Sequence, residues 1–339
     1  MSSHCQSPDI TVLLPAYNAE PFITEAVMSI LQQSYTNFVL LIIDDGSTDR
    51  TGEILEELAS RDGRIALYRR ENRGLVATLN EGLSLCRTEL VARMDADDIA
   101  LPDRLAMQKD FMDAHPGIVV CGSDMVACES GKMLVYPRQE RCPVACLFGS
   151  PLAHPTVIFR KSIVESLGGY GEEMLFAEDY DLWARIIANG LKMANIPQPL
   201  LVYREHPQVD RFAYRCRSML TTQRIWVQQL QRLGICPTPG ELDSHAYCAA
   251  PCKDIAWRQK RAHQWLEKLC ACNRRERIYD QAMLEGQCAD ILRRFPQPVS
   301  FAKAPLFAFA RLARLLIASL FHDTTALKTF LRKLRRVRK

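Results

Sequence analysis

The sequence predicts an α/β fold in which a mostly parallel sheet is covered by helices on both faces. Three observations lead to this prediction. The first half of the chain alternates short apolar runs with amphipathic stretches of helical length. The apolar runs are continuous, as in strands that are buried on both faces. The chain has 339 residues, 48% of them hydrophobic, which is enough for one large domain and an appendage.

Four strands with helices between them form the first part of the predicted sheet. The strands are expected at residues 10–14, 38–43, 65–69 and 90–94. The helices are expected at 20–33, 51–61 and 75–86. This alternation is typical of parallel strands that are joined by helical crossovers.

The second part of the chain has a different composition. Shorter strands are expected at 118–121, 157–160 and 200–204, with a helix at 180–189. From about residue 210 the chain becomes rich in long Arg/Gln/Leu helical segments, and we place a boundary near 207–211. The expected organisation is a domain at 1–210, a helical region at 211–300 and a basic amphipathic tail at 301–339.

Polar residues follow each of the first four strands, at residues 15–18, 44–47, 72–74 and 95–98. In parallel α/β sheets, ligands bind beyond the carboxyl ends of the strands, where such loops converge. We therefore expect the functional site at this edge of the predicted sheet.

The acidic run DADD at 95–98 is the strongest local signal. Three carboxylates at a strand end repel one another unless a cation lies among them. Asp95 and Asp97 offer the hard oxygen ligands that suit Mg²⁺ or Mn²⁺ bound to a diphosphate. The alternative is a solvated acidic turn, in which Asp98 caps the helix that begins near Pro102.

The run DDGSTD at 44–49 also allows two interpretations. Ser47, Thr48 or Asp49 can cap the next helix after a glycine turn. The two leading carboxylates exceed what a cap needs, and one can accept hydrogen bonds from a nucleotide base or a ribose. Tyr17, on the neighbouring loop, offers a ring on which a base can stack.

Together these residues resemble the family 2 glycosyltransferases, which have the GT-A fold, a Rossmann-like sheet flanked by helices. The resemblance covers about residues 8–210. It rests on TVLLPAYNAEPFITEAVMSILQQSY, LLIIDDGSTDRT, NRGLVATLNEGL, VARMDADDIALPDR and FAEDYDLWARI, in the family's order. It implies inverting transfer from a nucleotide sugar, expected to be a UDP-sugar, with Mg²⁺ or Mn²⁺. The processive members' Gln-x-x-Arg-Trp motif is missing, so a non-processive enzyme is expected.

The resemblance also implies roles for individual residues. The residues expected at the donor are Pro15, Tyr17, Asn18, Asp45, Arg73, Asp95 and Asp97. The metal ligands are expected to be Asp95, Asp97 and His206. Asp179 matches the catalytic base that takes a proton from the acceptor hydroxyl.

Several alternatives remain open around these positions. Glu178, Asp179 and Asp181 can instead be acids favoured at a helix N-terminus. Trp183 either lines the acceptor pocket or belongs to the core. His154, Arg204 and His206 either approach the donor phosphates or are structural.

The thirteen cysteines are best explained as reduced thiols in a cytoplasmic protein, because no apolar leader follows Met1. Zinc binding is the alternative for a group of Cys and His residues whose spacing matches no common zinc motif. They are His245, Cys248, Cys252, Cys270 and Cys272.

The tail at 301–339 carries ten Lys/Arg and one acid, and 306–321 (LFAFARLARLLIASLF) is apolar except for two arginines. This pattern suits a helix that lies on an anionic membrane, at the inner face of the plasma membrane. A helix packed on the body of the protein is the alternative. Nucleic acid is not an expected partner, because aromatic residues do not interleave the basic ones. No apolar run is long enough to span a membrane.

The expected acceptor is a hydroxyl of a glycan or lipid-linked acceptor in cell-surface polysaccharide synthesis. A sugar nucleotidyltransferase is one alternative, but it would need a glycine-rich basic loop after the first strand. A catalytically inactive sugar-nucleotide-binding protein is the other. The joint presence of Asp45, Asp95, Asp97 and Asp179 argues against it.

Overall fold

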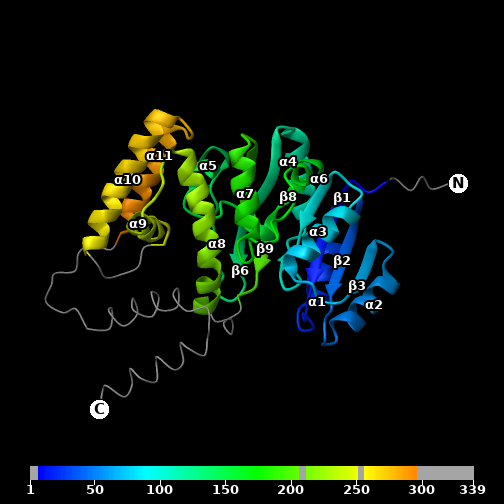
Figure 1. The fold of residues 1–339 in the computed structure, drawn as a ribbon. Coiled ribbons are helices and arrows are strands. Elements are labelled where there is room, and N and C mark those ends of the chain that lie inside the picture. Colours follow the sequence, from blue (N-terminus) through cyan, green and yellow to red (C-terminus); the bar gives the residue numbers. More distant parts are fainter. Residues whose placement is uncertain (1–6, 206–210, 251–255, 296–339) are drawn as a thin grey trace, which may run out of the picture.

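The computed structural model describes residues 7–205, 211–250 and 256–295. A nine-stranded sheet lies among helices, and the last described helices lie to one side of it (Figure 1). The strands run in the order β3-β2-β1-β4-β8-β6-β9-β5, and β7 pairs with β6. The prediction of an α/β fold with a helical C-terminal region is confirmed.

The bounds of the elements are as follows. The strands are β1 (Ile10–Ala16), β2 (Phe38–Asp45), β3 (Ile65–Arg70), β4 (Leu90–Arg93), β5 (Ile99–Ala100), β6 (Ile118–Ala127), β7 (Met133–Leu134), β8 (Ile158–Arg160) and β9 (Lys192–Tyr203). The helices of the sheet-containing part are α1 (Ile23–Leu31), α2 (Thr51–Arg61), α3 (Leu75–Leu85), α4 (Arg104–Ala114), α5 (Cys142–Cys146), α6 (Lys161–Ser166) and α7 (Glu178–Ala188). They are followed by α8 (Arg211–Arg232), α9 (Pro239–Ala249), α10 (Ala256–Glu276) and α11 (Gln281–Arg293).

The strands β1 to β4 form a parallel half-sheet, with β1 between β2 and β4 and with β3 beyond β2. The other half is mixed, because β8 is antiparallel to β4 and β6 while β9 is parallel to β6. The carboxyl ends of the four parallel strands therefore meet at one edge of the sheet, as the sequence predicted.

The residues of β1 show why its apolar run is continuous. Val12 and Leu14 pack in a core with α1, α2 and α4, whereas Leu13 packs in a second core with α3 and α7. Both faces of the strand are buried, so both need apolar side chains. Gly82 lets α3 approach closely, because a Cβ at this position would overlap the side chain of Leu13.

The helices α9, α10 and α11 have a core of their own, which reaches back to α5. Leu266, Leu269 and Leu284 belong to this cluster, together with Val144 and Phe148. The division of the chain into three parts stays a prediction, because residues 206–210 and the tail at 301–339 lie outside the described residues. Within the described residues, no helix combines the length and the apolar character needed to cross a membrane.

Candidate active site

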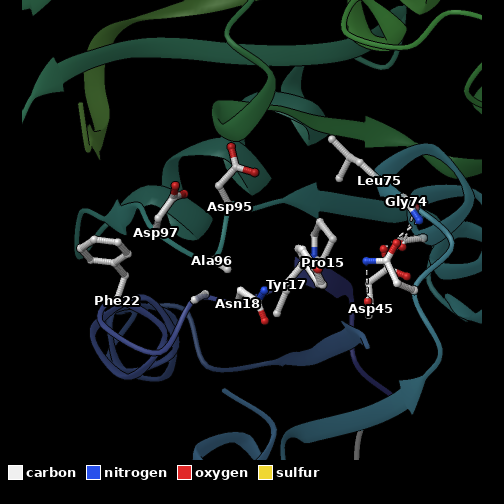
Figure 2. Close-up of a pocket in the computed structure, with 14 residues that line it drawn as sticks. Pro15, Tyr17, Asn18, Phe22, Asp45, Gly74, Leu75, Asp95, Ala96 and Asp97 are labelled. Atoms are coloured by element: carbon white, nitrogen blue, oxygen red, sulfur yellow. Dashed lines mark hydrogen bonds between the residues drawn. The ribbon is translucent and has the colours of Figure 1, made fainter. Parts of the chain in front are cut away.

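The loops after β1 to β4 border a cavity of about 570 Å³ (Figure 2). The described residues that line it are Pro15, Ala16, Tyr17, Asn18, Ala19, Phe22, Asp45, Asn72, Gly74, Leu75, Thr78, Asp95, Ala96 and Asp97. The structure thus brings together six of the seven residues expected at the donor. Arg73, the seventh, is part of the same loop as Asn72 and Gly74 but is not among the residues that line the cavity.

Asp45, at the end of β2, organises the loop that opens α3. Its Oδ1 accepts the backbone N–H of Arg73 at 2.8 Å, and its Oδ2 accepts that of Gly74 at 2.9 Å. Arg70 forms an ion pair with the same carboxylate and donates to Thr78 Oγ1 at 2.8 Å. Asp45 is only 4% exposed, so its carboxylate is surrounded mainly by these hydrogen-bond partners and not by solvent.

Asn18 joins the first loop to the second. Its backbone is left-handed, with φ of +48°, and its N–H donates to Ser47 Oγ at 3.0 Å. Its side-chain Oδ1 accepts the backbone N–H of Thr48 at 2.8 Å. Tyr17, next to it, is 52% exposed, which leaves its ring accessible from the cavity.

The neighbouring turn is held by two other acids. Asp44 accepts the N–H of Ser47 at 3.0 Å and the Nε–H of Arg69 at 3.1 Å. None of the three expected caps is the N-cap of α2, which is Arg50 and makes no side-chain cap bond. Asp49, directly before it, accepts the N–H of Thr51 at 3.0 Å. Asp44 and Asp49 therefore shape the loop, and Asp45 is the acid of this run that faces the cavity.

The carboxylates of Asp95, Asp97 and Asp98 form a cluster after β4. One oxygen from each lies within 4.8 Å of the other two. Asp98 is 1% exposed, and its Oδ2 has no hydrogen-bond partner among the described residues. Burial and the charge of Asp95 raise the pKa of Asp98 to about 8. Crowded carboxylates with an unsatisfied buried oxygen are suited to bind a divalent cation.

Arg204 clamps this cluster against α1. Its N–H donates to Asp98 Oδ1 at 2.9 Å, and its Nε–H donates to the carbonyl oxygen of Asp97 at 2.8 Å. Its Nη2 donates to Glu25 at 2.7 Å, and its guanidinium carbon lies 4.8 Å from the centroid of the Phe22 ring. The interpretation of Asp98 as a helix cap is wrong, because α4 begins at Arg104 with Asp103 as its N-cap.

Asp179 lies in the first turn of α7, close to a second acid. Ser150 Oγ donates to Asp179 Oδ2 at 3.4 Å, and burial raises the pKa of Asp179. Burial and the charge of Asp179 raise the pKa of Glu178 to about 7. Burial also raises the pKa of Asp95. The positive charge of Arg93 opposes this increase in pKa at Asp95 and the one at Asp179. The buried Arg93 side chain therefore connects the acidic cluster with the start of α7.

Three of the open alternatives are decided by burial and contacts. Asp181 is structural, because it forms an ion pair with Arg185 at 2.8 Å, and Arg185 also donates to two carbonyl oxygens of the 167–169 turn. Trp183 belongs to the core, since it is 0% exposed. His154 is buried, and its Nε2 lies 3.0 Å from the hydroxyl oxygen of Tyr170. Burial lowers the pKa of His154 well below its usual value. It is a neutral structural histidine.

The zinc alternative finds no support in the described residues, where the only cluster suited to a metal is that of Asp95, Asp97 and Asp98. His245 bonds instead to the carbonyl oxygen of Leu147 at 2.8 Å and to the indole N–H of Trp265 at 3.1 Å. His206, expected as a metal ligand, and Cys252 lie outside the described residues.

Sequence reasoning assigned no role to several residues that shape the site. Arg70 and Arg93 hold its carboxylates, while Phe22, Leu75 and Thr78 line its cavity. An arginine at the end of a buried strand was an available signal for Arg93, which ends β4, but not for Arg70, because β3 is partly exposed. The three lining residues depend on how the loops fold together, and the local sequence gave no indication of them.

Comparison with known proteins gives consistent results. Residues 11–159 match the family model described as "Glycosyl transferase family 2". The chain is 33% identical over 208 residues to the amylovoran biosynthesis glycosyltransferase AmsE of Erwinia amylovora, covering 57% of this chain and 75% of AmsE. It is 31% identical over 203 residues to the UDP-Gal:alpha-D-GlcNAc-diphosphoundecaprenol beta-1,3-galactosyltransferase of Escherichia coli, covering 58% and 74% of the two chains.

Among solved structures, the mannosyltransferase PcManGT of Pyrobaculum calidifontis, in complex with GDP-Man and Mn²⁺, has the same fold. The TM-score is 0.57 at 20% identity, covering 85% of this chain and 88% of that one. The GT-A architecture expected from the sequence is therefore confirmed. With the family match and the two relatives of more than 30% identity, it shows that the chain is a glycosyltransferase and belongs to glycosyltransferase family 2.

Proposed function

We propose that this glycosyltransferase is inverting, metal-dependent and non-processive, and that it acts on a glycan or lipid-linked acceptor in cell-surface polysaccharide synthesis. One observation carries the proposal. A single cavity is lined by Asp45 at one side, by the acidic pair Asp95 and Asp97 at the other, and by Pro15, Tyr17 and Asn18 between them (Figure 2). An elongated donor with a base at one end and a diphosphate at the other fits this arrangement.

The donor is proposed to be a UDP-sugar. The Escherichia coli relative is named for UDP-Gal, and it is more similar to this chain than PcManGT, which was solved with GDP-Man. The exposed ring of Tyr17 can stack on the base, beside Pro15 and Asn18. Asp45 then acts on the donor in two ways, by facing the cavity and by fixing the loop of Arg73 and Gly74.

Asp95 and Asp97 are proposed to hold Mg²⁺ or Mn²⁺, with His206 as a further ligand. The unsatisfied oxygen of Asp98 beside them is the feature of this chain that fits a cation. When bound, such a cation supplies positive charge to the leaving diphosphate. Arg204 contributes by holding the loop of Asp97 and Asp98 in place.

Asp179 is proposed as the general base. Inversion by a single in-line displacement needs one group that accepts the proton of the attacking hydroxyl. Burial raises the pKa of Asp179, which makes its carboxylate a better proton acceptor at neutral pH. The backbone N–H of Tyr180 and the charge of Arg93 partly stabilise the carboxylate in its charged form.

The acceptor side rests on the names of the relatives. One is named for an N-acetylglucosamine-diphosphoundecaprenol acceptor and the other for amylovoran biosynthesis. We propose a cytoplasmic protein that can lie at the inner face of the plasma membrane through its basic tail, residues 301–339.

A thermal-shift screen of UDP-Gal, UDP-GlcNAc, UDP-Glc and GDP-Man, each with and without Mn²⁺, tests the proposal. A donor present at one hundred times its Kd should add about 2.7 kcal/mol to the free energy of unfolding. The effective donor should also release its nucleoside diphosphate when acceptor is added. Equal stabilisation with and without Mn²⁺, or none by any nucleotide sugar, contradicts the proposal.

A further inference from the structure

The loop before α7 exposes an aromatic ring from a strained backbone. Phe176 has φ of +66°, a left-handed conformation that costs a bulky residue on the order of 1–3 kcal/mol. Its side chain is nevertheless 40% exposed, so the free energy gained by burying the ring offsets only part of the backbone strain. Strain of this kind persists where the surrounding structure enforces it, and it is concentrated at functional sites.

The conformation of this loop is enforced from both sides. Within the loop, the N–H of Met174 donates to the carbonyl oxygen of Gly171 at 3.0 Å. The N–H of Ala177 donates to the carbonyl oxygen of Met174 at 3.1 Å. From α8, Thr221 Oγ1 donates to the carbonyl oxygen of Leu175 at 3.1 Å. The ring of Phe176 is thus presented by a braced loop, with the guanidinium carbon of Arg217 at 5.9 Å from its centroid.

The exposed ring lies close to the proposed base. Phe176 and Asp179 are three residues apart, so their Cα atoms are separated by no more than about 11 Å even in an extended chain. A sugar ring and its hydroxyl can bridge such a distance. The helices α7 and α8, which follow and brace the loop, pack side by side (Figure 1).

Other exposed apolar side chains lie in the loop and on α8. Leu175 and Leu220 are 53% and 55% exposed, and Met219 is 38% exposed. The described residues that line the donor cavity do not include Phe176 or any of these side chains. These exposed apolar side chains are therefore separate from the lining of the donor cavity.

We propose that Phe176 is an acceptor-binding residue. The C–H face of the acceptor sugar lies on the exposed ring, and this brings the reacting hydroxyl to Asp179. An aromatic platform of this kind recognises a pyranose by shape and apolar contact rather than by charge. The inference rests on the role proposed for Asp179.

The test compares Phe176→Ala with Phe176→Tyr, in the full-length protein. The probe acceptor is N-acetylglucosamine linked through an α-diphosphate to an undecyl chain. The alanine variant should raise the KM for this acceptor about tenfold or more, while the KM for the donor and its slow hydrolysis by water stay unchanged. The tyrosine variant should restore the KM, because it keeps the ring. Tyr68→Ala is the matched control, since Tyr68 on β3 is 45% exposed.

Binding of the same acceptor, followed by saturation-transfer NMR, needs no turnover and separates this inference from the proposed base. If Phe176→Ala loses acceptor binding while Asp179→Asn keeps full turnover, the platform stands and the base is misassigned. An unchanged acceptor KM and unchanged binding in Phe176→Ala overturn the platform. A change in oligomeric state without a change in KM also overturns it, because the ring would then be an interface between copies.

Discussion

Replacing Glu178 with Gln should make the protein more stable than wild type as the pH rises. Glu178 is 8% exposed at the start of α7, and burial together with Asp179 raises its pKa from 4.5 to about 7. Between these values the folded state keeps a proton that the unfolded state releases. The stability supplied by the neutral carboxyl is therefore complete below pH 4.5 and is lost as the pH rises through 7.

The shift in pKa sets the size of the effect. At 1.36 kcal/mol per unit, a rise from 4.5 to about 7 corresponds to about 3 kcal/mol. Glutamine has the shape of the protonated acid and does not titrate. The free energy of unfolding of Glu178→Gln, minus that of wild type, should therefore increase by up to about 3 kcal/mol between pH 5 and pH 8.

Urea denaturation at pH 5, 6, 7 and 8, in the absence of divalent metal, measures this difference. Glu173→Gln is the matched control, because Glu173 is exposed on the loop before α7. A difference for Glu178→Gln that stays within about 0.5 kcal/mol across the range, or that falls with pH, refutes the reasoning.

Three further substitutions test the donor and base assignments. Asp97→Ala should abolish Mn²⁺-dependent binding of UDP in calorimetry, and undiminished affinity would remove Asp97 from the metal site. Asp179→Asn should keep donor binding while transfer falls by about 10²–10⁴, whereas near-normal turnover would move the base elsewhere. Asp45→Ala removes the acceptor of the Arg73 and Gly74 N–H groups and leaves Arg70 with its ion pair to Glu81, which should cost about 1–3 kcal/mol in urea denaturation and weaken donor binding. A loss below about 1 kcal/mol would show that Asp45 does not brace the loop.

The parallel half of the sheet could be predicted because its signal is local. The strands β1, β2 and β4 are short runs buried on both faces, and β3 is a partly exposed edge strand. The expected bounds of all four agree with the structure within two residues. The first part of β9 was missed, since Pro197 and Pro199 interrupt its apolar pattern and remove two donors. The strand tolerates them through register shifts opposite Ser123 and Asp124 in β6. The two-residue strands β5 and β7 exist only through tertiary pairing.

The site was predictable to the extent that its residues directly follow strands. Asp45 and Asp95 were found in this way, because the carboxyl ends of parallel strands meet at one edge. The sequence could not decide whether Trp183 faces a pocket or the core, because both places suit an indole on that face of the helix. It also gave no indication of Phe176, whose significance lies in its φ and exposure and not in its residue type.

Two buried arginines explain how the acidic cluster can exist before any cation binds. Arg93 forms an ion pair with Asp95, and Arg104, which is 0% exposed, donates to the carbonyl oxygen of Arg93 at 2.6 Å. Burial lowers the pKa of Arg104 to about 10, which still leaves it charged at neutral pH, and the charges of Asp98 and Asp95 oppose this decrease. Positive charge behind the cluster therefore offsets part of the repulsion among its carboxylates.

This arrangement also has a consequence for the reaction. Because the charge of Arg93 acts on Asp95 and on Asp179, a change of charge at Asp95 influences the proton affinity of Asp179. Positive charge added at Asp95 would weaken its hold on Arg93 and leave that guanidinium freer to stabilise the carboxylate form of Asp179. Buried side chains that are fixed by packing can transmit such an effect without a movement of the backbone.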